Sequence, residues 1–182
     1  RVHRLWHTVF CMIAQGAKEF VLGAERSRYD PAHYMINTVE LPIVGQIVEA
    51  SPERPYLGLW MDLPPSVVTA VMMESGMMPT RGDGSAVKSV DVSPLDVSLL
   101  DATLRLVRLI EAPGEYRVLA PLVTREIVYR LLTRAQAHRM RDLATVGGQT
   151  HRMVRAGEKL RKNFNKPLRI ESVARELGMS VS

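Results

Sequence analysis

The sequence predicts an α+β fold in which a sheet-rich first part is followed by helices and by the start of a helix-turn-helix. Residues 8–63 contain short runs rich in β-branched and aromatic residues, separated by turn-forming residues. After Leu63, apolar residues recur every three or four positions, which is the period of a helix. Residues 169–182 place an amphipathic helix, a glycine turn and a capping serine in succession, which is the layout of a helix-turn-helix.

Five strands are expected between residues 8 and 63. The first two, in TVFCMIAQGAKEFVLG, meet at Gln15-Gly16-Ala17, which indicates a β-hairpin. The other three are HYMINT, IVGQIVEA and YLGLWMDL. The breaks between the strands contain Asp30-Pro31, Leu41-Pro42 and the turn SPERP. Short strands with turns between them favour a sheet that folds on itself as a barrel or sandwich.

Three helical segments are expected next. PPSVVTAVMMESG begins with prolines and stops at a glycine, as helices often do. SPLDVSLLDATLRLVRLIEAPG is the clearest helix, with Ser93 as the expected N-cap, Pro94 in the first position and Pro113-Gly114 at the end. In EYRVLAPLVTREIVYRLLT, Pro121 either lies in the first turn or kinks the helix.

The break VGGQ divides the chain into two expected domains, residues 1–146 and residues 147–182. Charge is distributed unevenly along the chain. From Arg125 to the end there are 13 Lys and Arg against 5 Asp and Glu, whereas residues 1–124 hold 11 against 14. A positive charge confined to the C-terminal third favours a nucleic acid as partner, with an anionic membrane surface as the weaker alternative.

Membrane insertion and secretion are not indicated. No apolar run approaches the roughly 18 residues of a membrane span, and no secretory signal is recognisable. The single cysteine, Cys11, cannot form an internal disulfide, which suits a reducing cytosol. We therefore expect a cytoplasmic protein that makes no membrane contact.

A helix expected over THRMVRAGEKLRKNF carries a single basic stripe. Its cations share one helix face because they are three or four positions apart: Arg152, Arg155, Lys159 and Lys162. Such a stripe neutralises phosphates, although an ordinary solvated helix face has the same pattern. In the closing motif, Ser180 and Ser182 begin the second helix, where backbone N–H groups and hydroxyls can meet a phosphate. These six residues are the expected DNA contacts.

Four segments follow one another in an order that matches a known family: CMIAQGAKEFVLGAERSRYDP, VELPIVGQIVEASPERPYLGLWMDL, PLVTREIVYRLL and KPLRIESVARELGMSVS. They resemble the AraC-type transcriptional regulators, in particular the subgroup with its own distinctive N-terminal domain. The resemblance implies a cupin-like β-barrel with accessory helices, followed by a DNA-binding domain of two helix-turn-helix units. Only the first half of the first unit is present, so we expect the base-reading residues beyond Ser182. Since no leader precedes the first strand, we also expect further residues before Arg1.

A barrel of this kind can hold a small organic effector. Alternation places Cys11 and Ile13 on one strand face, and likewise Tyr34 and Ile36, while Gln46 adds a polar group. If these faces point inward, the five residues line the effector pocket. The alternative is a barrel filled by its own side chains, with Cys11 as a buried structural thiol rather than a sensor.

Metal binding is not expected in the barrel. The histidines of this part are His3, His7 and His33, and they lack the spacing that metal-dependent cupins use. We therefore expect no metal and no other cofactor.

The helix from Pro94 to Glu111 is apolar on more than one side. Heptad-like spacing groups Val97, Leu100, Leu104 and Val107 on one face, and another side carries Leu99, Leu106 and Ile110. Two apolar faces suggest two contacts, one with the barrel and one with a second subunit. The contact with the second subunit would use Val97, Leu100, Leu104 and Val107. Packing within a single chain would produce the same pattern.

The resulting hypothesis is a bacterial, sequence-specific DNA-binding transcription regulator whose barrel domain senses a small effector, dimerises, or does both. It is not expected to be an enzyme. DNA, a small organic effector and a second copy of the chain are the expected partners, and RNA polymerase is a further candidate. Two other classes stay open, namely a metal-dependent cupin-type enzyme and a small-molecule-binding adaptor without DNA binding.

Overall fold

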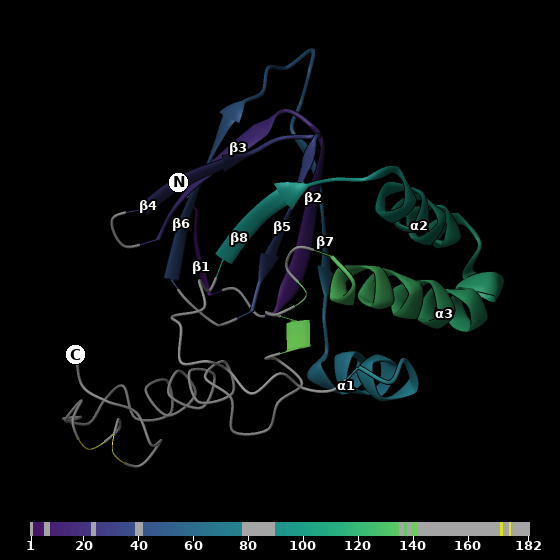
Figure 1. Cartoon of the computed structure of the whole chain (residues 1–182). Coiled ribbons are helices and arrows are strands. Elements are labelled where there is room, and N and C mark those ends of the chain that lie inside the picture. Colours follow the sequence, from purple (N-terminus) through teal and green to yellow (C-terminus); the bar gives the residue numbers. More distant parts are fainter. Residues whose placement is uncertain are drawn as a thin grey trace.

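The computed structural model places the strands on one side of the molecule and the helices on the other (Figure 1). The predicted α+β class, with a sheet folded on itself and accessory helices, is confirmed. Of the expected helix-turn-helix, only Ser172 and Arg175 are described, and both are helical. The structure describes residues 2–5, 8–22, 25–38, 42–77, 90–134, 137, 140, 141, 172 and 175.

In the described part of the chain, eight strands form two antiparallel four-stranded sheets. The first sheet has the order β1-β6-β3-β4, and the second has the order β7-β2-β5-β8. The strands of the first sheet are β1 (Val2–Leu5), β6 (Pro42–Glu49), β3 (Ala17–Leu22) and β4 (Glu25–Tyr29). Those of the second are β7 (Leu57–Asp62), β2 (Val9–Gln15), β5 (His33–Asn37) and β8 (Val90–Pro94).

The two sheets meet across an apolar interior. Buried side chains from both sheets form one cluster there: Val9, Cys11, Ile13, Met35 and Val90 from the second sheet, and Phe20 and Tyr29 from the first. The rings of Phe20 and Tyr29 meet edge to face, with their centroids 6.1 Å apart. The described interior is therefore occupied in large part by the protein's own side chains.

The predicted hairpin at Gln15-Gly16-Ala17 is wrong. β2 and β3 follow one another directly, but β2 pairs with β5 and β7, whereas β3 pairs with β4 and β6. Gly16 carries the chain from one sheet to the other with a φ of 87°. A Cβ at this position would lie 2.3 Å from the carbonyl oxygen of Glu49, so a side chain is excluded both by conformation and by space.

Three strands of the structure are not predicted from the sequence, namely β1, β4 and β8. β4 has the sequence ERSRY, whose charges hide the strand signal. It pairs with β3, and its outward Arg26 and Arg28 form ion pairs with Glu19 of β3 and Glu49 of β6. β8 pairs with β5 at the edge of the second sheet.

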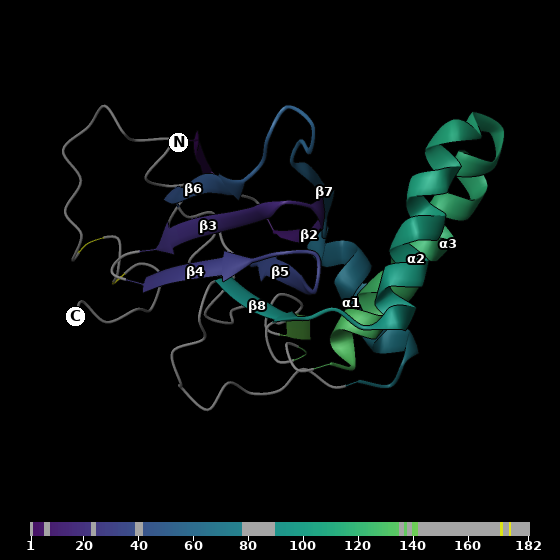
Figure 2. The same cartoon turned by 90° about the horizontal axis from the view of Figure 1, so that it is seen from above.

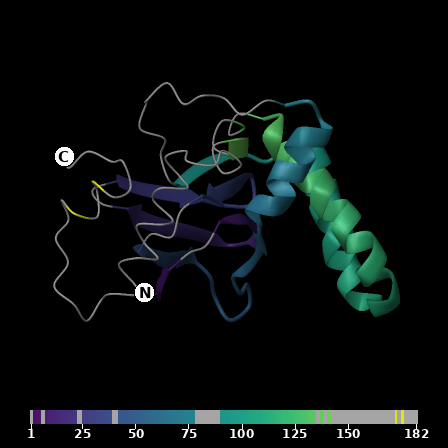
Figure 3. The ribbon, with the colours of Figure 1, turned by 90° about the horizontal axis from the view of Figure 1, so that it is seen from below.

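Three α-helices and one 3-10 turn are described, and they cover the second sheet on the side away from the interior (Figures 2 and 3). The α2–α3 pair extends beyond the end of the sheets in both views. The helical elements are α1 (Pro65–Glu74), α2 (Val97–Arg108), the 3-10 turn η1 (Leu109–Glu111) and α3 (Pro113–Leu132).

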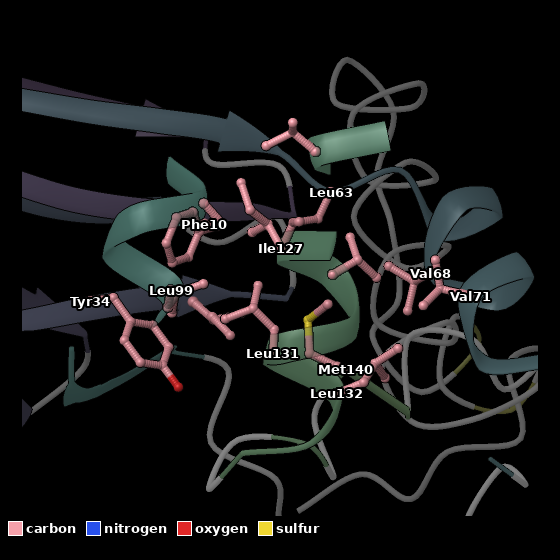
Figure 4. Packing of buried hydrophobic residues seen from close by; sticks show 14 of the residues in the cluster. Phe10, Tyr34, Leu63, Val68, Val71, Leu99, Ile127, Leu131, Leu132 and Met140 are labelled. Atoms are coloured by element: carbon pink, nitrogen blue, oxygen red, sulfur yellow. The ribbon is translucent and has the colours of Figure 1, made fainter. Parts of the chain in front are cut away.

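A second, larger core lies between the second sheet and the helices. Figure 4 shows Phe10 and Tyr34 of the strands directed towards Leu99 of α2 and Leu131 of α3. The ring centroids of Phe10 and Tyr34 are 5.7 Å apart. At the other end of this core, Val68 and Val71 of α1, Leu132 of α3 and Met140 pack together. The helical layer is thus held mainly by apolar burial against one sheet face.

The start of α2 differs from the prediction. Ser93 and Pro94 do not begin the helix but end β8, because they pair with Tyr34 and His33 of β5. Asp96 is the N-cap instead, and its Oδ1 accepts hydrogen bonds from the backbone N–H groups of Ser98, at 2.9 Å, and Leu99, at 3.1 Å. Its Oδ2 forms an ion pair with Arg134, directly after α3.

The two halves of α3 have different surroundings. The residues from Pro113 to Leu119 are all exposed, whereas from Ala120 onwards one face is buried against the sheet and α1. Pro121 lies in the helix interior, beyond the first turn, so one of the two predicted placements is excluded. Because proline has no N–H, the carbonyl of Arg117 lacks its helical hydrogen-bond donor.

Gly16→Ala is expected to lower the free energy of unfolding by at least about 2 kcal/mol, since alanine is strained at positive φ and its Cβ meets the backbone of Glu49. The matched control is Gly76→Ala, where φ is 66° but nothing lies within 4 Å of the added Cβ. We expect a loss of only about 1 kcal/mol there. Urea unfolding of both variants measures the difference, and equal losses would contradict the tight crossing at Gly16.

Candidate functional site

The residues predicted to line an effector pocket are divided between two faces of the second sheet. Cys11 and Ile13 point into the interior between the sheets. Tyr34 and Ile36 lie on the opposite face, beneath the helices, because β5 is paired so that Met35, opposite Cys11, takes the interior position. The structure therefore corrects the assumption that both pairs point inward.

Gln46 also lies away from the interior. It is exposed on β6, opposite Glu19 of β3, whereas the neighbouring Gly45 is buried opposite Phe20. The five predicted lining residues consequently do not come together in one pocket. Only Cys11 and Ile13 belong to the space between the sheets.

The structure adds Lys18 to this interior, a residue that the sequence analysis did not select. Lys18 is two positions from the buried Phe20, so the two side chains share a strand face. A Cβ at Gly45 would be 2.7 Å from Lys18 Cε and 3.3 Å from its Nζ, which shows that the lysine side chain lies across this glycine. The spacing of two residues from Phe20 does indicate that Lys18 faces the interior. A lysine in a strand, however, normally indicates the face exposed to solvent.

Cys11 lies close enough to Lys18 for the two to interact electrostatically. Burial raises the pKa of the Cys11 thiol to about 12, Lys18 acts in the opposite direction, and Asp62 raises the pKa further. The desolvation effect dominates, so the thiol stays protonated at neutral pH. A protonated, buried thiol is a weak nucleophile.

Two tyrosine hydroxyls are further polar groups of the interior. Burial raises the pKa of Tyr29, and the nearby Cys11 and Tyr56 add to this effect. A side-chain hydrogen bond joins the hydroxyls of Tyr29 and Tyr56. The interior face therefore combines an apolar wall with polar groups that include a thiol, two phenols, an ammonium group and the buried Asn37 amide, and the Asp62 carboxylate lies opposite Val9 on the same face.

One edge of the interior keeps large side chains accessible. Trp60 of β7 is opposite Cys11 and so belongs to the interior face, but it is 50% exposed. Ile47 of β6 is opposite Lys18 and is 48% exposed. Side chains that face the interior but remain half accessible mark the region between β6 and β7 as the open side of the described interior.

The predicted subunit face on α2 is accessible in the described structure. Val97 is 83% exposed, and Leu100, Leu104 and Val107 are also exposed. In contrast, Leu99 is fully buried in the core against the sheet, and Ala102 and Thr103 are buried too. Packing within the described chain therefore accounts for one face of α2 but leaves the face with heptad-like spacing uncovered.

One ion pair joins α2 to α3, and two further ion pairs lie within the helices. The guanidinium of Arg105 on α2 contacts Asp101 at 3.0 Å and Glu126 of α3 at 2.6 Å, and Arg130 contacts Glu126 at 2.6 Å. These arginines, Arg105 foremost, lower the pKa of Glu126 against the opposing effect of burial. The Glu126 carboxylate therefore links the two helices through Arg105.

All six predicted DNA contacts lie outside the described residues. They are Arg152, Arg155, Lys159, Lys162, Ser180 and Ser182. Their arrangement stays a prediction.

The family model described as AraC-type transcriptional regulator N-terminus matches residues 1–139, which covers the two sheets and the three helices. The chain belongs to this family. Such a domain is part of transcriptional regulators, a class that is not enzymatic as a rule. No curated protein matches the chain by sequence.

Solved structures of ToxT from Vibrio cholerae share the fold. The apo form from strain SCE256 has a TM-score of 0.59 at 7% identity, over 98% of this chain and 65% of that protein. ToxT from strain O395, bound to (E)-4-(8-methylnaphthalen-1-yl)but-3-enoic acid, has a TM-score of 0.62 at 9% identity, over 98% and 66%. ToxT from SCE256 bound to an unsaturated fatty acid has a TM-score of 0.56 at 6% identity, over 98% and 63%.

The predicted cupin-like barrel with accessory helices is confirmed by this likeness together with the two facing sheets. The chain spans just under two thirds of the length of these ToxT structures. Within the described residues, no helix is long and apolar enough to cross a membrane. The same residues contain no group of three or more His, Cys, Asp or Glu side chains placed to hold a metal ion.

Proposed function

We propose that this chain is the effector-binding and dimerising part, with the start of the DNA-binding part, of a cytoplasmic, sequence-specific transcription regulator. The observation that carries the proposal is the family match over residues 1–139. The concentration of positive charge after Arg125 supports a DNA-binding role for the C-terminal third. In this proposal, residues 1–146 form the regulatory domain and residues 147–182 belong to the DNA-binding domain.

The basic stripe of Arg152, Arg155, Lys159 and Lys162 is proposed to contact the phosphate backbone, with Ser180 and Ser182 at the start of the recognition helix. Backbone contacts make affinity depend on salt, because each neutralised phosphate releases counterions. The sequence read by the protein would depend on other side chains.

Substituting Arg155→Ala in the natural protein is expected to reduce the slope of log affinity against log salt by about 1 on its selected DNA site, since one phosphate contact is lost. Arg54→Ala, in the exposed loop after β6, removes the same charge from the barrel and is expected to leave the slope unchanged. Fluorescence anisotropy over a salt series gives both slopes. Specific DNA binding with equal salt slopes for the two variants would show that the basic stripe does not contact the phosphates. If no specific DNA site is found, the proposal that the protein is a regulator is wrong.

The proposed effector is a small organic acid with an apolar body, bound in the barrel interior near Cys11, Ile13 and Lys18. The apolar walls would bury the body of such a ligand, and the Lys18 ammonium would bind its carboxylate with a charge-assisted hydrogen bond. The accessible side between β6 and β7 supplies a route of entry. Acids bound to ToxT structures of the same fold support this ligand class.

Oleate is the probe for this site. We expect Lys18→Met to weaken oleate binding by about tenfold or more, because a hydrogen bond between charged groups is lost. Arg26→Met, on the outward face of β4, removes one cation from the same sheet and should bind oleate like the wild type. Calorimetric titration compares the variants. Unchanged affinity in Lys18→Met, or equal affinity for oleyl alcohol, would rule out the carboxylate contact.

The exposed face of α2 is proposed to form a homodimer through Val97, Leu100, Leu104 and Val107. An antiparallel pairing centred on Leu104 would place Leu100 level with Arg108 of the partner subunit and Asp101 level with Val107 of the partner subunit, so that Asp101 lies next to Arg108 of the partner subunit. A parallel pairing in register would instead place Asp101 beside its own copy. Charge complementarity therefore favours the antiparallel dimer.

Leu104→Glu is expected to turn the dimer into a monomer, because a charge replaces an apolar side chain at the centre of the interface. Leu57→Glu, on the exposed start of β7, is the matched control and should remain dimeric. Sedimentation equilibrium measures both masses. Asp101→Arg should weaken the dimer and Asp101→Arg with Arg108→Asp should restore it. A monomeric wild type, or a double variant no stronger than the single one, would contradict this interface or its orientation.

A further inference from the structure

A depression lies along α3 on the side of α1, away from the outer face of α2. It has a volume of about 510 Å³ and is lined by Val67 of α1 and by six residues of α3: Tyr116, Arg117, Ala120, Pro121, Thr124 and Arg125. Figures 1 and 3 show α1 beside α3 in this region. The depression is distinct from the barrel interior and from the proposed dimer face.

A second depression continues the first towards the start of α3. It is lined by Ile110, Pro113, Tyr116 and Arg117, so Tyr116 and Arg117 belong to both. Together they form one strip, which we call the α3 groove. From Pro113 to Arg125 a helix rises by about 18 Å, which is the length of a helical segment of about 12 residues.

The floor of the α3 groove is apolar although it is open to solvent. Ile110 is 65% exposed and Tyr116 is 44% exposed, and Val67, Ala120 and Pro121 continue the apolar surface. The exposed first half of α3 receives no cover from the rest of the described chain. Apolar side chains in a groove at helical spacing are typical of a surface that accepts the apolar face of another helix.

The charged groups of the α3 groove are all positive. Its lining includes Arg117 and Arg125 and no acidic side chain. Arg125 forms an ion pair with Glu74 at the end of α1. The side chain of Arg117 forms neither a hydrogen bond nor an ion pair with the described residues. A partner that supplies a carboxylate next to its apolar anchors would therefore complement this surface.

The positive charge of Arg117 and Arg125 distinguishes between the segments that could bind in the α3 groove. Residues 135–182 of the chain itself carry 10 Lys and Arg against 4 Asp and Glu, so this part has the wrong charge for the α3 groove. A positive lining suits a partner with acidic side chains around an apolar stripe.

We propose that the α3 groove binds an acidic amphipathic helix of a partner protein, with leucine-type or aromatic anchors over Ala120 and Pro121 and a carboxylate on Arg117. The interaction would use the side of the helical layer that the dimer face leaves free. It does not depend on DNA binding or on an effector.

The probe is a stapled 14-residue helical peptide with leucines at positions i, i+3, i+4 and i+7 and glutamates flanking them, together with a second peptide in which lysine replaces each glutamate. We expect the acidic peptide to bind the wild-type chain and the basic peptide to bind at least tenfold more weakly. Arg117→Glu should weaken the acidic peptide by about tenfold and strengthen the basic one. Arg54→Glu, the same charge change far from α3, should alter neither by more than twofold.

A second variant tests the groove itself without changing charge. Thr124→Trp fills the depression and is expected to reduce binding of the acidic peptide by about tenfold, while the circular dichroism spectrum and Tm stay those of the wild type. Fluorescence anisotropy measures all affinities. The proposal is overturned by an acidic peptide that does not bind, by equal binding of the two peptides, or by binding that ignores Arg117→Glu and Thr124→Trp. A fall in the sedimentation mass of Thr124→Trp would assign the groove to a second copy of the chain instead.

Discussion

Burial of both faces of the second sheet is the constraint on which the rest of the structure depends. Five consecutive residues of β2, Val9–Ile13, are buried, because alternate side chains enter two different cores. Phe10 and Met12 belong to the core under the helices, and Cys11 belongs to the interior between the sheets. The helical layer and the first sheet are therefore held by opposite faces of the same strand, and losing either one would expose a continuous apolar surface to water.

Period and turn chemistry predict β2, β3, β5, β6 and β7, the helices α1 and α3 and the body of α2, but they do not show which side chains face which core. Both faces of β5 are apolar, so alternation alone does not show that Met35, rather than Tyr34, points into the interior. Lys18 was missed because its position depends on space that Gly45 leaves on a neighbouring strand. The hairpin predicted at Gly16 is wrong because the strands on either side of it pair with strands distant in the sequence. That pairing decides the path of the chain, and local turn residues do not reveal it.

The proposed partners occupy separate parts of this architecture. An effector would lie on the interior side of β2, a second subunit would cover the outer face of α2, and an acidic helix would lie between α1 and α3. The ion pair of Arg105 with Glu126 joins α2 to α3, so the last two surfaces lie on connected helices. These three surfaces share no lining residue.

Asp96 uses its two carboxylate oxygens for different elements. One oxygen holds the first turn of α2 through backbone N–H groups, and the other holds Arg134, where the chain leaves α3 towards its C-terminal third. Arg134 also donates a hydrogen bond to the Ser98 hydroxyl at 3.0 Å. If α2 moved along its axis, Asp96 would therefore pull on Arg134 and on the residues that follow it. The ion pair between these two side chains would transmit the movement.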